Sequence, residues 1–146
     1  MNTGKEIGIG LLGALAVSAA HETIRRILPQ APRMDKLGMQ AISLLLEKAN
    51  HTPLSEKELY LIAMVGDIIS NGLYYSAAGS DNRKKTIIKG ALLGAAAGVG
   101  ALVLPGPLGL NKEYSNKTMQ TKAITFGLYL FGGIFTSVLM NKMNKK

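Results

Sequence analysis

The sequence predicts an all-α fold: a small polytopic bundle of membrane helices, with four long helices and one short helix that is amphipathic or only just spans the bilayer. Hydrophobic residues make up 47% of the 146 residues and charged residues 18%, whereas a soluble domain carries charge on about a quarter of its residues. The run of residues 90–104 has no charged or polar side chain. Gly90, Gly94 and Gly98 lie four apart and form one stripe, which weakens a helix in water but allows close helix packing in a bilayer.

The first helix is predicted over residues 4–28 and ends before Pro29, because the residue before a proline disfavours the helical conformation. Its apolar part is shorter than the ~20 residues of a typical span, so it crosses by tilting or by continuing into the polar turn that follows. Gly8 and Gly13 give it a small-residue face, and we expect this face to pack against the stripe at Gly90. A secretory signal peptide is the alternative for this segment, but its n-region is nearly neutral.

A short second helix is predicted over residues 35–49, after a rigid turn that contains two prolines. Its moderately amphipathic pattern is too short and too polar for a clear span, so it lies in the interface or crosses only partly. The third helix is predicted over residues 56–78. Ser55 and Glu58 before and within its first turn match a capping box, which favours a helix start at this point.

The fourth helix, residues 84–104, carries the glycine stripe and ends where Pro105 and Pro107 follow. A polar loop leads to the fifth helix, residues 123–140, in which a few threonines and serines are the only polar interruptions. Both runs are long and apolar enough to be predicted as spans.

The distribution of basic residues predicts the topology, because lysines and arginines concentrate on the cytoplasmic side of a membrane. If the short second helix crosses, then Arg25, Arg26, the basic turn at Arg83 and the tail at Lys142 all share the cytoplasmic side, and the N-terminus lies outside. If it does not cross, the arginines face outward. We expect the first arrangement, in the inner cell membrane, with a cytoplasmic C-terminus.

The third helix carries the first candidate site. Asp67, Ser70, Asn71 and Tyr74 follow the spacing i, i+3, i+4 and i+7, so they share one face of an otherwise apolar helix. An acidic side chain at the centre of a span costs about 2.5–3.5 kcal/mol on insertion scales. This face is therefore either a binding or conduction site with Asp67 as its charge, or a hydrogen-bond network that holds helices together.

The end of the first helix carries a second candidate cluster of charged and titratable residues. Its members are His21, Glu22, Arg25, Arg26 and Arg33. The first four form two i,i+4 pairs, His21 with Arg25 and Glu22 with Arg26. We expect Arg25 or Arg26 to neutralise Asp67 through a salt bridge. The arginines form either a pocket for an anion or lipid headgroup or an ordinary interfacial belt of charge.

Composition restricts the possible functions. A net charge of +8 would indicate nucleic acid binding in a soluble protein, but aromatic residues are only 5% of the chain and the charges gather at the ends of apolar runs. We therefore expect anionic lipid headgroups as partners and no nucleic acid. The chain has no cysteine, which excludes thiol catalysis and cysteine-ligated zinc, and we expect no metal or other cofactor.

We therefore expect a non-enzymatic membrane protein that binds or conducts a small ion, or an anionic or lipid ligand, through the third helix and the end of the first. A pore or carrier made from so short a chain would be a homo-oligomer. One alternative is a membrane-embedded enzyme acting on a phospholipid-like substrate, with His21 or Asp67 as general base. The others are a structural or accessory subunit and a soluble basic helical domain.

Overall fold

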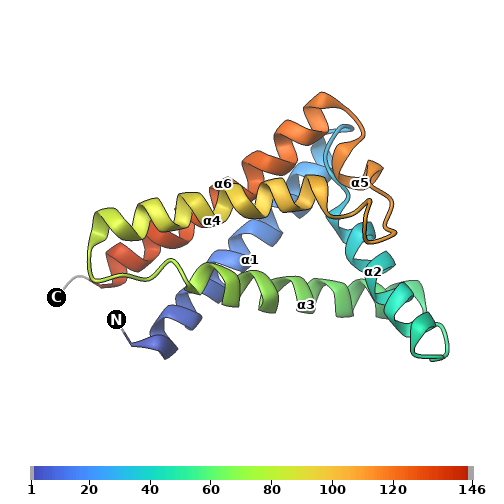
Figure 1. The fold of residues 1–146 in the computed structure, drawn as a ribbon, viewed down its shortest axis with the longest axis horizontal. Helices are drawn as coiled ribbons and strands as arrows, with labels where there is room; N and C mark the ends of the chain where they lie inside the picture. Colours follow the sequence, from blue (N-terminus) through green and yellow to red (C-terminus); the bar gives the residue numbers. More distant parts are fainter. Residues whose placement is uncertain (1, 145–146) are drawn as a thin grey trace.

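The computed structural model describes residues 2–144, which form six helices and no strand. Four long helices run back and forth between the two ends of the molecule (Figure 1). They are α1 (Thr3–Ile27), α3 (Glu56–Ser76), α4 (Arg83–Val103) and α6 (Met119–Met143). Two shorter helices, α2 (Met34–Lys48) and α5 (Glu113–Asn116), lie at the end where α1 finishes and α3 begins. The all-α fold is thus confirmed, and α5 is an additional element.

Local signals explain where the helices begin. Ser55 Oγ accepts a hydrogen bond from the backbone N–H of Glu58, and the Glu58 carboxylate accepts one from the N–H of Ser55, so the predicted capping box is confirmed. Asn82 caps α4 and Thr118 caps α6 in the same way, through side-chain oxygens. The Thr118 cap starts α6 four residues before the predicted position.

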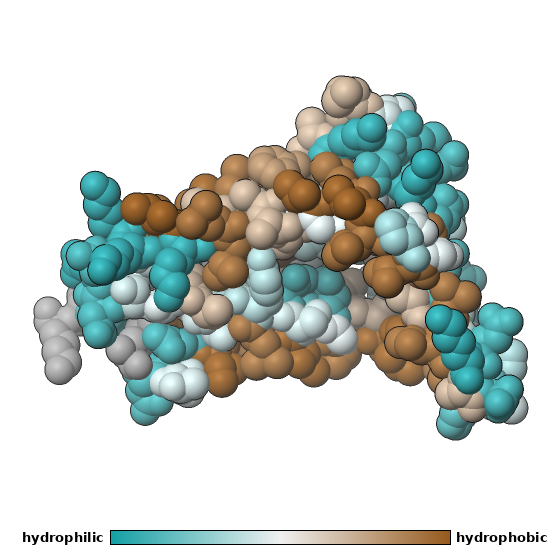
Figure 2. All heavy atoms as spheres, viewed as in Figure 1, coloured by the Kyte–Doolittle hydropathy of each residue, from teal (hydrophilic) through white to brown (hydrophobic). Residues whose placement is uncertain are grey.

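Three helices, α1, α4 and α6, are long and apolar enough to cross a membrane. The predicted fourth span, α3, is as long as α4, but the polar residues of its second half lower its hydropathy. On the face seen in Figure 2, two bands of apolar side chains run along the middle of the molecule with a strip of more polar side chains between them, and hydrophilic side chains gather towards its ends. Fully buried side chains of α6, in contrast, include Thr125, Thr136 and Ser137. Apolar residues outside and small polar residues inside suit a protein whose solvent is lipid.

The glycine stripe of α4 packs against α6. Gly90, Gly94 and Gly98 are all buried, and a Cβ atom at Gly94 would lie 2.7 Å from the carbonyl oxygen of Tyr129. A Cβ atom at Gly90 would collide with Ser137. The expectation that this stripe packs against the first helix was wrong, because α6 lies along it, with Gly133 opposite Gly90 and the backbone of Tyr129 opposite Gly94.

Helix α1 instead packs on α3 and α6. A Cβ atom at Gly13 would collide with Thr136 of α6, and one at Gly10 would collide with the Gly72 carbonyl of α3. Gly8 is exposed and nothing lies within 4 Å of a Cβ atom built there, so the packing role expected for Gly8 is not seen.

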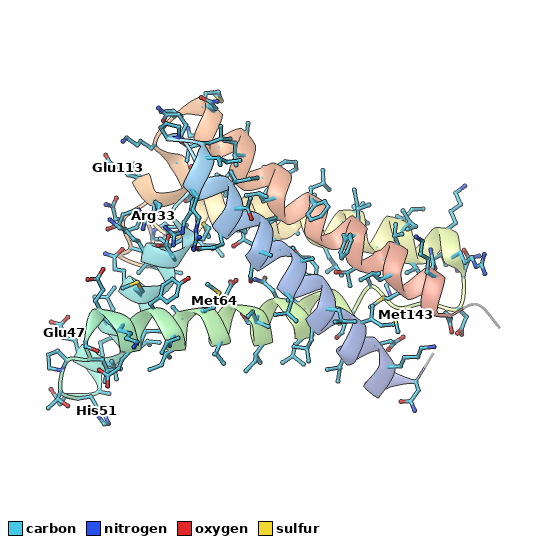
Figure 3. The ribbon with its side chains drawn as sticks, turned by 180° about the vertical axis from the view of Figure 1, so that it is seen from behind. Arg33, Glu47, His51, Met64, Glu113 and Met143 are labelled. Atoms are coloured by element: carbon cyan, nitrogen blue, oxygen red, sulfur yellow. The ribbon has the colours of Figure 1, made fainter. Side chains whose placement is uncertain are left out.

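The predicted topology, in which the second helix crosses, requires the start of the first helix and the end of the last to lie at opposite ends of the molecule. The structure has them at one end, and the side of a membrane that each end faces stays a prediction. Lys5 Nζ donates a 2.5 Å hydrogen bond to the carbonyl oxygen of Met143, so the start of α1 and the end of α6 meet at one end of the molecule. Arg33 lies at the opposite end from Met143 (Figure 3). The reason is that α2 has 15 residues and spans about 22 Å, less than a hydrocarbon core of about 30 Å. It packs against α3 and α5 instead.

Candidate functional site

A polar cluster centred on Asp67 lies near the middle of α3. Its Oδ1 accepts a hydrogen bond from Asn71 Nδ2 at 2.8 Å, and its Oδ2 accepts one from Ser18 Oγ of α1 at 3.3 Å. Both donors are neutral. No ion pair reaches Asp67 anywhere in residues 2–144, so the predicted salt bridge to Arg25 or Arg26 was wrong.

The arginines do not reach Asp67 because Glu22 holds both of them. Arg25 Nη2 lies 2.6 Å from a Glu22 carboxylate oxygen, and Arg26 Nη2 lies 2.8 Å from the same oxygen. The predicted pair of Glu22 with Arg26 is confirmed. The predicted pair of His21 with Arg25 was wrong, since Arg25 binds the Glu22 carboxylate instead. The Arg26 side chain remains 71% exposed although it shares this carboxylate.

His21 is half-buried against α6, and both of its ring nitrogens are buried. Its ring meets the ring of Tyr129 edge to face, with 5.4 Å between the ring centroids. Neither ring nitrogen has a hydrogen-bond partner, which is unusual for buried polar atoms. His21 is therefore the one strongly unsatisfied side chain next to the Asp67 cluster within the described part of α1.

Arg33 forms a bidentate pair with Asp35 at the start of α2, with N–O distances of 2.9 and 2.7 Å. Burial acts to raise the pKa of Asp35, but the hydrogen bonds and charge of Arg33 outweigh it and hold this pKa below its usual value. The same hydrogen bonds raise the pKa of Arg33. Each arginine of the predicted anion pocket is thus already engaged by a carboxylate, which weakens that interpretation.

A small, partly open cavity of about 70 Å³ lies between α1, α2 and α3. Ser18, His21 and Asp67 line it together, and Glu22 and Arg25 also contribute to its wall. Its further lining includes Tyr60, Met64 and Gly38. Its volume is enough for a few water molecules or a small ion, because one water needs only about 10–15 Å³ of such space. Sequence reasoning missed the contributions of Ser18 and of α2, since nothing in the pattern says which helices meet there.

A second and larger space, an open groove of about 480 Å³, lies between α3 and α4. Ser70, Asn71 and Tyr74 line it, and the α4 wall is made of alanines and Gly100. The predicted α3 face is therefore divided. Asp67 lines the cavity, whereas Ser70, Asn71 and Tyr74 line the groove. The hydrogen bond between Asp67 and Asn71 lies between the two spaces. Of the remaining predicted residues, Arg26 and Arg33 line neither space.

Comparison of the chain with protein-family models, curated proteins and solved structures finds no significant match.

Proposed function

We propose that the protein binds a small monovalent cation inside the membrane, with the Asp67 carboxylate as the charged ligand. The observation that carries this proposal is that Asp67 lines a small, partly open cavity and accepts side-chain hydrogen bonds only from Ser18 and Asn71 among the described residues. An ionised carboxylate in an apolar interior costs several kcal/mol unless a positive charge compensates it. Two neutral donors stabilise the charge in part, and a bound cation would complete its neutralisation.

The proposal requires α3 to be a fourth span. Leu61, Val65, Ile69 and Leu73 support this, because they form an outward face on α3 and each side chain is about half exposed. In addition, α3 runs antiparallel beside α1, which is itself apolar enough to cross. Four spans put both ends of the chain on one side. We propose that this side is the cytoplasmic face of the inner membrane, since the first turn of α4 carries the basic residues 83–85.

A thermal-unfolding titration of the purified protein in lipid nanodiscs tests the cation site. Chloride salts of Na⁺, K⁺, NH₄⁺ and methylammonium would be varied at constant ionic strength. A ligand at 100 times its Kd stabilises the folded state by about 2.7 kcal/mol, so we expect at least one salt to raise the unfolding temperature. Asp67→Asn keeps the side-chain shape and should abolish this rise. Glu47→Gln, which removes an exposed carboxylate of α2 that lines neither space, is the matched control and should retain it.

Two outcomes would overturn the proposal. In one, Asp67→Asn shows the same salt-dependent rise as the unmodified chain. In the other, no salt stabilises the protein and Asp67→Asn lowers the unfolding temperature equally in all salts. The second outcome would identify the Ser18–Asp67 hydrogen bond as a purely structural tie between α1 and α3.

A further inference from the structure

We infer that the cation bound at Asp67 is amphiphilic, a protonated amine with an apolar tail, and that it enters from the bilayer through the groove between α3 and α4. This inference rests on the proposed function, because it names the ligand class of the same site. Three features of the groove lead to it.

The first feature is the apolar, uncharged lining of the groove. Ala96, Ala97 and Gly100 leave space along α4, and no lining residue carries a charge. The volume of about 480 Å³ falls within the range of roughly 300–1,000 Å³ that ligand pockets occupy. The outward residues of both walls, Leu73 on α3 and Leu92 on α4 among them, are exposed and apolar. The groove therefore opens between lipid-facing surfaces, and its occupant reaches it from the hydrocarbon.

The second feature is that the polar groups of the groove present acceptors. Ser70 Oγ donates its hydrogen to the Asp67 carbonyl at 3.2 Å, and Tyr74 Oη donates its hydrogen to the Leu93 carbonyl at 2.9 Å. Each hydroxyl oxygen then retains lone pairs and no free hydrogen. An anionic headgroup would find neither a positive charge nor a free hydroxyl donor here, whereas an ammonium N–H would find acceptors.

The third feature connects the groove to the buried charge. A carboxylate can only accept hydrogen bonds, so Asn71 turns its NH₂ group to Asp67 at 2.8 Å. The side-chain carbonyl oxygen of Asn71 is the negative end of the amide dipole. It points away from the NH₂ group and accepts no hydrogen bond from the described residues. Tyr74 and Tyr129 also line the groove, and aromatic faces attract alkylammonium groups. A cation with a tail in the groove would thus place its charge next to Asn71 and Asp67.

The test compares methylammonium with decylammonium, both as chlorides and below the micellar concentration of the latter, by calorimetric titration of the protein in nanodiscs. Empty nanodiscs correct for partition into lipid. Ala97→Phe fills the groove, and Val99→Phe places the same ring on the exposed side of α4 as the matched control. We expect Ala97→Phe to weaken decylammonium binding at least tenfold and methylammonium binding less than twofold. Val99→Phe should change neither.

The outcomes separate this inference from the proposed function. If methylammonium binding requires Asp67 while decylammonium fails to bind, or binds equally well to Ala97→Phe, the inference is wrong and the cation site stands. If neither amine responds to Asp67→Asn, the inference is wrong, and the proposed function is wrong as well if Asp67→Asn leaves the effects of Na⁺, K⁺ and NH₄⁺ unchanged. A concentration-dependent dimer that Ala97→Phe disrupts, without decylammonium binding, would assign the groove to a second copy of the chain and overturn the inference.

A second variant guards against misfolding of Ala97→Phe. A Cβ atom at Gly100 would meet only Leu104 Cδ1, at 3.5 Å, so Gly100→Leu can fill the same groove without a backbone collision. It should reproduce the selective loss of decylammonium binding. Unchanged decylammonium binding in a folded Gly100→Leu protein would contradict the inference.

Discussion

The Asp67 carboxylate and the Asn71 amide, one helical turn apart on α3, are joined by a hydrogen bond of 2.8 Å that lies between a small cavity and a larger, more open groove. The acid is therefore reached from two sides, from α1 through Ser18 and from the groove through Asn71. Rotation of one amide side chain would connect the two spaces. Substitutions at Asn71 should consequently affect both the stability of the bundle and the properties of the acid.

Replacement of Asn71 by Ala removes one of the two donors to Asp67. Hydrogen bonds to charged groups contribute about 1.5–3 kcal/mol, so we expect the free energy of unfolding to fall by that amount. Reversible unfolding in mixed micelles measures it. Ser70→Ala, on the exposed neighbouring residue, should change the value by less than about 0.5 kcal/mol. An equal loss of unfolding free energy in both variants would mean that the hydrogen bond from Asn71 to Asp67 does not stabilise the folded protein.

Gly94→Ala should separate α4 from α6. The added Cβ atom would lie 2.7 Å from the Tyr129 carbonyl oxygen and 2.8 Å from the Leu130 Cα atom, and neither backbone atom can move alone. Overpacking of this kind costs about 1–3 kcal/mol, which the same unfolding measurement detects. Gly127→Ala is the control, because nothing lies within 4 Å of a Cβ atom there. A Gly94→Ala protein as stable as Gly127→Ala would argue against the close α4–α6 contact.

The pair of Asp35 with Arg33 gives a pH dependence with a definite sign. Because the pKa of Asp35 is lower in the folded protein than in the unfolded chain, its contribution to stability is complete above the unfolded value of about 3.9. The contribution is lost as the pH falls through the folded value. The difference in unfolding temperature between the unmodified protein and Asp35→Asn should thus be constant from pH 6 to 8 and shrink below about pH 4. A difference that grows on acidification would contradict this assignment.

The arrangement of the helices can be tested by cysteine labelling, since the chain has no cysteine of its own. Asn50→Cys lies in the turn after α2, and Ser80→Cys and Lys142→Cys lie at the opposite end of the bundle. In sealed vesicles of one orientation, a membrane-impermeant maleimide should label Asn50→Cys from one side and the other two only from the other side. Labelling of Asn50→Cys and Lys142→Cys from the same side would restore the topology in which α2 crosses.

The features that the sequence predicted well are local ones. The prolines at 29 and 105, and the capping box at Ser55 and Glu58, are signals within a few residues of the helix ends that they fix. The contact of Glu22 with Arg26 is also local, since i,i+4 neighbours meet on any helix.

The features that failed were choices among distant partners. Both α1 and α4 carry a glycine face. The spacing of the glycines identifies such a face but does not show which helix packs against it. The stripe at Gly94 met α6 because α6 brings its backbone close there. Asp67 was assigned an arginine because opposite charges attract, but Glu22, only three residues from Arg25, was the nearer acid. The cavity wall from α2 depends on how the chain turns after Pro29, which no local pattern specifies.

The contact between Lys5 and Met143 brings the two extremities of the bundle within a hydrogen bond of each other. A short peptide could therefore join them, and the chain could be reopened in the turn between Ser76 and Arg83. Such a circular permutant would be synthesised with α4 and α6 first and with α1 and α3 last. The pair of α1 and α3 and the pair of α4 and α6 each start and finish at the same end of the bundle. We therefore expect that either pair can be synthesised and inserted into the membrane first.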